Sequence, residues 1–134
     1  MIPKFRAWDK KYKKMMKVNQ IDFEKKTVWL EADNGDHENR HTLTREFKDV
    51  ILMQSTGLKD KNGVEIFEGD IVQYRDGEYS YLGIVKRDCY QFFIDGIEPD
   101  DNYDFIDVSN TFDGTSSLEI IGNIHENPEL LEGN

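Results

Sequence analysis

The sequence contains few residues that form cross-links or bind metals, with one cysteine, three histidines and three prolines among 134 residues. The single cysteine, Cys89, excludes a disulfide bond within the chain and is typical of a protein in a reducing cytosol. No hydrophobic run approaches the ~20 residues of a membrane-spanning helix, and residues 1–6 are too polar for a signal peptide. We therefore expect a cytoplasmic protein that makes no contact with a membrane.

The composition is polar for a globular protein, with 37% hydrophobic and 33% charged residues. Aromatic residues make up 12% of the chain, and together with the many valines and isoleucines they suffice to build a core. The composition thus excludes wholesale disorder. The length is that of one domain, or of a barrel with an attached subdomain.

The net charge of −10 is unevenly distributed. Residues 1–26 carry nine basic and three acidic side chains, a net charge of +6, and the remainder carries −16. After Arg87 there is no lysine or arginine, whereas twelve acidic residues follow. Two interpretations fit this distribution: the oppositely charged ends attract each other within one fold or between copies, or the basic end binds a polyanion. The overall acidity argues against a dedicated DNA-binding domain, since such domains are usually basic as a whole.

Short β-strands dominate the predicted secondary structure. Turn residues separate several stretches rich in β-branched and aromatic residues, at 5–8, 15–23, 27–31, 64–67, 71–75, 81–85, 90–94 and 118–124, with a weaker candidate at 103–105. In the hairpin predicted from 81–85 and 90–94, the even-numbered positions fall on one face, namely Leu82, Ile84, Tyr90, Phe92 and Ile94. Many short strands with little helix predict a mainly β fold, either a small barrel or a curled sheet.

Local patterns also predict turns and short helices. The Asn-Gly pair at 62–63 predicts a tight turn, because these residues tolerate positive φ angles, and residues 68–70 predict another. Residues 44–54 are ambiguous, since a short helix over 45–48 capped by Thr44 competes with a buried strand at 50–53. Pro128 predicts the first turn of a helix at 127–131.

Three blocks of the sequence together span nearly the whole chain: KFRAWD at 4–9, LMQSTGLKDKNGVEIFEGDIV at 52–72 and IIGNIHENPELL at 120–131. In content and order these blocks resemble the YopX family of phage and prophage proteins. The middle block is the most specific, because a run of that length rarely recurs by accident. Ser55 departs from the aromatic residue that we expect at this place in many relatives.

The resemblance implies an SH3-like barrel in the C-terminal half, opening near residues 68–72, and a gene in a phage or prophage genome of a bacterial host. It implies no reaction and supplies no catalytic residues. We therefore expect an SH3-like barrel domain at 51–134. Residues 1–50 either form an N-terminal β subdomain or add strands to the sheet.

Two groups of histidine and acidic residues are candidate metal sites. His37 and His41 lie four residues apart among acidic residues, but their surroundings are typical of a polar loop and not of a helix that would present both rings. The acidic stretch 98–107 lacks the glycine and the terminal glutamate of a calcium-binding EF-hand loop, so we interpret it as an acidic surface loop. We expect no metal and no cofactor.

The sequence offers no catalytic set. It contains neither a G-x-S-x-G elbow nor a phosphate-binding G-x-x-x-x-G-K-[ST] loop, and we interpret Cys89 as a small packing residue. The acidic pair Glu68 and Asp70 flanks a glycine, and turn geometry accounts for it more simply than acid–base catalysis. We therefore expect a protein that is not an enzyme.

One group of residues is a candidate interaction surface. A strand at 4–8 places alternate residues on one face, with the lysine-rich turn at 10–14 alongside, and the candidates are Lys4, Arg6, Trp8, Lys11, Lys13 and Lys14. A face that is both cationic and aromatic can stack bases and contact phosphates. The alternative is that the tryptophan packs in a subunit or domain contact while the lysines are solvated.

These observations support one functional hypothesis and an alternative from another class. The first is a non-enzymatic accessory protein, a β interaction module that self-associates or binds a host protein. The alternative is a nucleic-acid-binding protein that uses the basic, aromatic N-terminal edge. A third hypothesis, imitation of nucleic acid by the acidic half, rests on charge composition alone.

Overall fold

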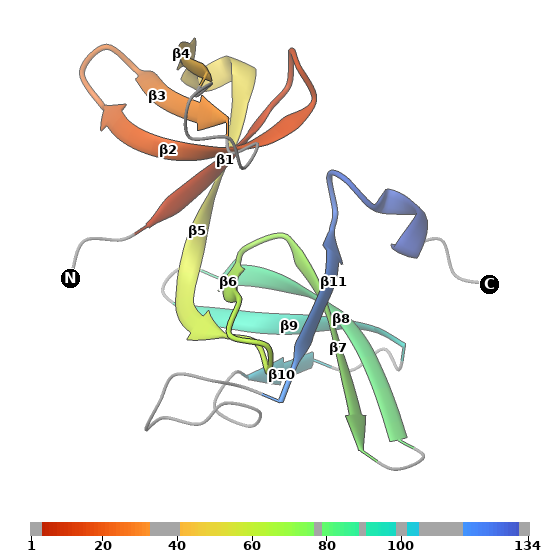
Figure 1. The fold of residues 1–134 in the computed structure, drawn as a ribbon. Helices are drawn as coiled ribbons and strands as arrows, with labels where there is room; N and C mark the ends of the chain where they lie inside the picture. Colours follow the sequence, from red (N-terminus) through yellow and green to blue (C-terminus); the bar gives the residue numbers. More distant parts are fainter. Residues whose placement is uncertain are drawn as a thin grey trace. The chain divides into compact units, whose positions relative to one another are not determined.

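The computed structural model describes residues 4–32, 41–76, 79–88, 91–98, 102–104 and 117–131. The chain divides into two compact units, unit 1 (Met1–Gln54) and unit 2 (Ser55–Asn134). The strand that joins them runs through the boundary and contributes to both (Figure 1). Throughout the described ranges the regular elements are β-strands and short 3-10 helices, which confirms the mainly β class.

Unit 1 is an antiparallel sheet built from four consecutive strands and a returning fifth. The strands are β1 (Phe5–Asp9), β2 (Lys14–Asp22), β3 (Thr27–Ala32), β4 (His41–Glu46) and β5 (Val50–Lys59), and the 3-10 helix η1 (Phe47–Asp49) joins β4 to β5. The pairing order is β4-β3-β2-β1-β5, so β1 lies between β2 and β5. This order follows from the returning strand, because β5 pairs antiparallel with β1 from Gln54 opposite Phe5 to Val50 opposite Asp9.

The core of unit 1 lies on one face of this sheet. Alternate residues of the strands point toward it, as the period of two in a β-strand requires, and the buried members are Ala7, Met16, Val28, Leu30 and Val50. The opposite face carries the residues between them, most of which are more exposed, although Met53, opposite Arg6, is buried. We call it the outer face.

Unit 2 repeats this connectivity. Its strands are β6 (Glu65–Phe67), β7 (Asp70–Asp76), β8 (Tyr79–Asp88), β9 (Gln91–Glu98), β10 (Asn102–Asp104) and β11 (Glu119–Asn123), followed by the 3-10 helix η3 (Pro128–Leu131). Five of them form an antiparallel sheet in the order β10-β9-β8-β7-β11, again four consecutive strands with a fifth that returns to the first. The second part of β5 pairs with β6.

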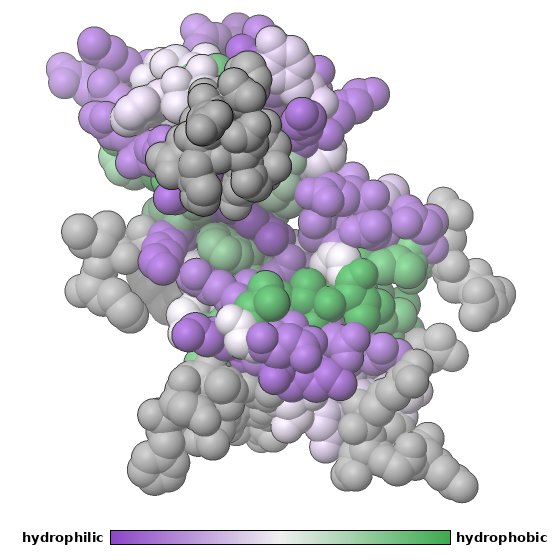
Figure 2. Space-filling model, in the orientation of Figure 1, coloured by the Kyte–Doolittle hydropathy of each residue, from purple (hydrophilic) through white to green (hydrophobic). Residues whose placement is uncertain are grey.

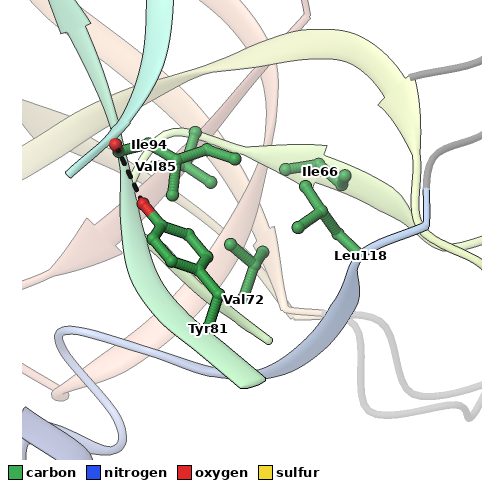
Figure 3. Close-up of a cluster of buried hydrophobic side chains, with 6 residues drawn as sticks. All are labelled: Ile66, Val72, Tyr81, Val85, Ile94 and Leu118. Atoms are coloured by element: carbon green, nitrogen blue, oxygen red, sulfur yellow. Dashed lines mark hydrogen bonds between the residues drawn. The ribbon is translucent and has the colours of Figure 1, made fainter. Parts of the chain in front are cut away.

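The core of unit 2 is formed by Ile66, Val72, Tyr81, Val85, Ile94 and Leu118, which converge from β6, β7, β8, β9 and the residue before β11 (Figure 3). Five of these side chains are fully buried, and the sixth, Tyr81, is 3% exposed. The Tyr81 hydroxyl donates a hydrogen bond to the carbonyl oxygen of Ile94 at 3.2 Å, which satisfies its one polar group.

The expected SH3-like barrel is not closed in the part of the chain that the structure describes. The outermost strands of the five-stranded sheet are β10 and β11, which pair with β9 and β7 respectively and not with each other. Two antiparallel sheets are therefore the supported architecture. The expected domain boundary at residue 50 falls at the start of β5, whereas the units separate within that strand.

The structure resolves the ambiguous stretch 44–54. Thr44 lies within β4, the short helix is η1 at Phe47–Asp49, and its N-cap residue Glu46 makes no side-chain capping bond, so the predicted cap is wrong. The strand at 50–53 is confirmed as the first part of β5. The predicted helical turn near the C-terminus is confirmed as η3.

The predicted face of the β8–β9 hairpin is wrong. The register places Asp88 opposite Gln91 and Val85 opposite Ile94, so odd-numbered residues of β8 face even-numbered residues of β9. The core side of β8 therefore carries Tyr81 and Val85, whereas Ile84 lies opposite Asp95 on the other face. Numbering alone misassigned this face, because the register depends on how many residues separate the paired strands.

Candidate interaction surface

The acidic residue of the first family block, Asp9, is a structural group at the end of β1. Its side chain is fully buried, and its Oδ1 accepts a hydrogen bond from Arg45 Nε at 3.0 Å. Its Oδ2 accepts one from the backbone N–H of Tyr12 at 3.2 Å, so the carboxylate also shapes the turn that follows. The hydrogen bond with Asp9 raises the pKa of Arg45 above its usual value, because the carboxylate favours the charged guanidinium.

The second family block contains another buried carboxylate, Asp60, with a similar role. Its Oδ1 accepts hydrogen bonds from the backbone N–H groups of Asn62 and Val64, both at 2.9 Å, and its Oδ2 accepts one from Ile120 at 3.1 Å. The turn predicted at 62–63 is confirmed, with Gly63 at a φ of 84°. One side chain thus shapes a local turn and ties it to β11, across 60 residues of sequence.

The remaining polar residues of the family blocks shape turns in the same way. Asp70 Oδ2 accepts a hydrogen bond from the Phe67 backbone N–H at 2.8 Å, which confirms the predicted turn at 68–70. Asn123 Oδ1 accepts from the N–H groups of His125 and Glu126 at 3.0 and 2.8 Å. The recognisable residues of the blocks therefore organise the backbone, and their carboxylates are engaged as acceptors.

The structure places two of the six candidate residues, Arg6 and Trp8, on the outer face of unit 1. Arg6 lies opposite Lys17 of β2 and Trp8 lies opposite Met15, whereas Ala7 points into the core. Because β1 is flanked by β2 and β5, these residues lie on a sheet face and not along a sheet edge. Lys4, which precedes β1, is exposed.

The lysines of the candidate set lie in or beside the turn between β1 and β2. Lys11 and Lys13 are exposed in this turn, and Lys11 Nζ lies 3.9 Å from Asp49 Oδ2 of η1. Lys13 has a φ of 54°, and Lys14 lies opposite Asp9 at the start of β2. Lys14 is thus on the core side of the sheet, although exposed, and the structure separates it from Trp8.

A second turn lies against the same 3-10 helix. The backbone N–H of Phe47 in η1 donates to the carbonyl oxygen of Lys26 at 2.9 Å, and the rings of Phe23 and Phe47 meet edge to face at 6.1 Å. On the other side of η1, the carbonyl oxygen of Asp49 accepts a hydrogen bond from the Lys10 backbone N–H at 3.0 Å. We call residues 10–13, 23–26 and 47–49 together the turn surface.

Sequence reasoning missed the aromatic residues of the turn surface. Tyr12 and Phe23 are 64% and 73% exposed, which makes them the most exposed large hydrophobic side chains in the described ranges. The guanidinium carbon of Arg45 lies 4.9 Å from the centroid of the Tyr12 ring and covers one side of it. The sequence does contain an indication of their exposure, because each ring lies in a polar turn, where no neighbouring residues form a core around it.

The outer face of unit 1 carries two further exposed hydrophobic residues. Trp29 of β3 and Ile51 of β5 are 45% and 38% exposed. Ile51 lies opposite Trp8, and Trp29 is two residues from Glu31, which lies opposite Lys17. Apolar and charged side chains thus alternate across one sheet face, a composition that is common in protein contact surfaces.

The hydropathy of the surface differs between regions of the molecule. In the view of Figure 2, hydrophilic side chains predominate on unit 1, whereas a hydrophobic band crosses unit 2 between hydrophilic areas.

Three groups of residues from the sequence analysis fall outside the side chains that the structure describes. They are the candidate metal residues at 37 and 41, the acidic stretch 98–107, and Cys89. No helix in the described ranges is both long and apolar enough to span a membrane.

Comparisons with known proteins agree with the family blocks. The model of the family described as YopX protein matches residues 4–132. A solved structure, the crystal structure of protein EF1440 from Enterococcus faecalis, is 30% identical to this chain, with a TM-score of 0.62. The match covers 98% of this chain and 99% of that one, and no curated protein matches the sequence. By its sequence over nearly its whole length, this chain belongs to the YopX family.

Proposed function

We propose that this chain is an accessory protein of phage or prophage genomes that works in the bacterial cytoplasm by non-covalent contact, and that its first partner is a second copy of itself. It performs no reaction in this proposal. In support, the buried carboxylates of its family blocks serve as turn acceptors, with Asp9 paired to Arg45 and Asp60 bound to three backbone N–H groups.

The opposite charges of the two units carry the proposal. Unit 1 contains twelve basic and nine acidic side chains, a net charge of +3, and unit 2 contains five basic and eighteen acidic ones, a net charge of −13. A surface of one sign attracts the opposite sign on another copy, and this attraction both steers the encounter and selects the orientation. When the basic unit of each copy meets the acidic unit of the other, the two equivalent contacts close a two-fold dimer, whereas a single such contact per pair builds rings or open chains of subunits.

The outer face of unit 1 supplies the apolar contact in this proposal. Tryptophan is among the residues that contribute most to binding at protein interfaces, and this face presents Trp29 together with Ile51 and Lys17. Charge alone would give a weak contact that salt screens completely. The apolar residues bury hydrophobic surface in the contact and so add to the binding free energy. A single substitution can remove this contribution.

Light scattering coupled to size-exclusion chromatography tests the proposal. We expect a particle heavier than the 15.7 kDa monomer at about 10 mM salt, where the Debye length is about 30 Å. At about 1 M salt, where the Debye length is about 3 Å, the mass should fall toward the monomer. The variant Trp29→Thr keeps a residue that favours strands and should be monomeric at both salt concentrations.

The matched control is Val64→Thr, which removes an exposed hydrophobic side chain from unit 2, where the valine is 53% exposed. This variant should associate like the wild type. Circular dichroism checks that both variants are folded. A wild-type protein of monomer mass at both salt concentrations refutes self-association, and a host protein recovered with the monomer then becomes the leading partner.

A further inference from the structure

We propose that the turn surface of unit 1 binds single-stranded nucleic acid, with bases stacked on Tyr12 and Phe23 and phosphates held by the surrounding lysines. The proposal goes beyond self-association, and its aromatic contacts lie in the turns, whereas the apolar contact proposed for self-association lies on the outer face of unit 1. It rests on the exposure of the two rings, on the charge around them, and on the contacts that hold both turns to one short helix.

The two turns form one continuous surface because both are tied to η1. On one side, Phe47 N–H bonds to the Lys26 carbonyl and the Phe47 ring meets that of Phe23. On the other side, Lys10 donates twice to η1, from its backbone to Asp49 O and from its Nζ to Lys48 O, both at 3.0 Å. A 3-10 helix of three residues is about 6 Å long, so the points at which the two turns contact η1 are close together.

Most of the surface of the two rings is exposed to solvent and contributes little to the folding of unit 1. Tyr12 and Phe23 are 64% and 73% exposed, so most of their apolar surface gains nothing from the core. A base of any sequence has a flat apolar face that can stack on such a ring. Arg45 lies against the Tyr12 ring on one side, as a cation–π partner that restrains its orientation.

The charge around the rings is positive. Residues of the turn surface include six lysines and two acidic side chains, a net charge of +4, and the basic members are Lys10, Lys11, Lys13, Lys25, Lys26 and Lys48. Lysines flank Tyr12 directly in the chain, at 11 and 13, and follow Phe23 at 25 and 26. A ring next to cations in each turn matches the alternation of base and phosphate along a nucleic-acid strand.

The backbone of both turns is held in place before any ligand arrives. Asp9 accepts from the Tyr12 N–H, and Asp22 Oδ1 accepts from the N–H groups of Glu24 and Lys25, both at 3.0 Å. Lys13 and Lys26 adopt left-handed φ values of 54° and 57°, which the surrounding bonds maintain. A prearranged site loses less conformational entropy when a ligand binds.

A single strand fits this surface better than a duplex. In a duplex the bases are stacked on each other and offer no face to Tyr12 or Phe23, whereas unpaired bases do. An acidic protein segment would satisfy the lysines but has no set of flat faces for the two rings.

Fluorescence anisotropy with the full chain tests the proposal. The probes are labelled twelve-residue oligonucleotides: single-stranded DNA, single-stranded RNA, the DNA duplex, and a DNA strand of the same length that carries abasic sites. We expect binding to both single strands at about 50 mM salt and weaker binding to the abasic strand and the duplex. The variants Tyr12→Ser and Phe23→Ser should each weaken single-strand binding about tenfold.

The lysines are tested through the salt dependence. The double variant Lys13→Gln and Lys25→Gln, which changes one lysine in each turn, should reduce the slope of log affinity against log salt concentration by about 1.4, because each lost phosphate contact on a single strand contributes about 0.7. The charge-preserving variant Lys13→Arg should retain the slope. The matched control, Lys59→Gln with Val64→Ser, changes an exposed lysine and an exposed apolar residue of unit 2 and should bind like the wild type.

Two results would overturn the proposal. One is the absence of any anisotropy change with either single strand at about 50 mM salt. The other is equal binding of normal and abasic strands that is insensitive to the two aromatic substitutions, which would mean attraction of a polyanion without stacking. Circular dichroism of each variant separates lost binding from lost folding, and light scattering of the same samples reports self-association independently.

Discussion

The buried carboxylate of Asp60 allows a sharp test of how the family blocks work, through the substitution Asp60→Asn. Asp60 is 1% exposed and uses both oxygens, since Oδ1 accepts from Asn62 and Val64 and Oδ2 accepts from Ile120. Asparagine has nearly the same shape but only one carbonyl oxygen. Whichever way its amide is oriented, the NH2 group faces a backbone N–H donor in place of an acceptor.

The expected loss of stability follows from these contacts. A net hydrogen bond to a charged group contributes about 1.5–3 kcal/mol, and a buried donor left without an acceptor costs about 1–3 kcal/mol. Asp60→Asn should therefore lower the free energy of unfolding by about 2–4 kcal/mol. In urea, where the slope is about 1–3 kcal/mol per molar for small proteins, the midpoint should fall by about 1–2 M.

Asp22→Asn is the matched control, because it makes the same chemical change at an aspartate that accepts its hydrogen bonds through one oxygen. Asp22 accepts from Glu24 and Lys25 through Oδ1 alone, in an exposed turn. Asparagine keeps that single oxygen, so the change in stability should stay within about 0.5 kcal/mol. If urea unfolding followed by circular dichroism gave the two variants equal midpoints, the argument that Asp60 needs both of its oxygens would be refuted.

Three further predictions concern packing and the buried ion pair, and urea unfolding measures each. Gly122→Ala should cost about 1–3 kcal/mol, because its new Cβ would lie 2.5 Å from Asn127 Oδ1; an unchanged midpoint would show that the asparagine moves aside. Leu30→Ala should cost about 2–5 kcal/mol, since Leu30 is fully buried in the core of unit 1. Arg45→Met should cost about 1–3 kcal/mol by leaving the buried Asp9 carboxylate without its ionic partner, and adding Asp9→Asn should recover part of that loss. A double variant no more stable than Arg45→Met alone would contradict this account.

The repetition of one strand order in both units is a feature that the sequence conceals. Each unit has four consecutive antiparallel strands and a fifth that returns to the first, yet the sequence shows no internal repeat. The order depends on which strands pair, and many different alternating sequences satisfy the same pairing. A search for repeated residues therefore could not detect it.

The turn surface, which we propose as a binding site, was visible in the sequence only in part. The basic turn between β1 and β2 was found from its lysines, because charge is visible in the sequence. The second turn and η1 were missed, since Phe23 and Phe47 lie 24 positions apart and meet only when β4 leads the chain back beside β3. The exposure of Tyr12 and Phe23 was not predicted either, because residue type alone does not show whether an aromatic side chain is buried.

The short strands, the turns between them and the family of the chain can all be predicted from its amino-acid sequence. These depend on local chemistry: β-branched residues favour extended backbone, and the Asn-Gly pair at 62–63 accepts the positive φ of a tight turn. The buried face of each strand and the structural role of the carboxylates are seen only in the folded chain. Those properties depend on register and on partners far along the chain, as with Asp9 and Arg45, 36 residues apart, and Asp60 and Ile120, 60 residues apart.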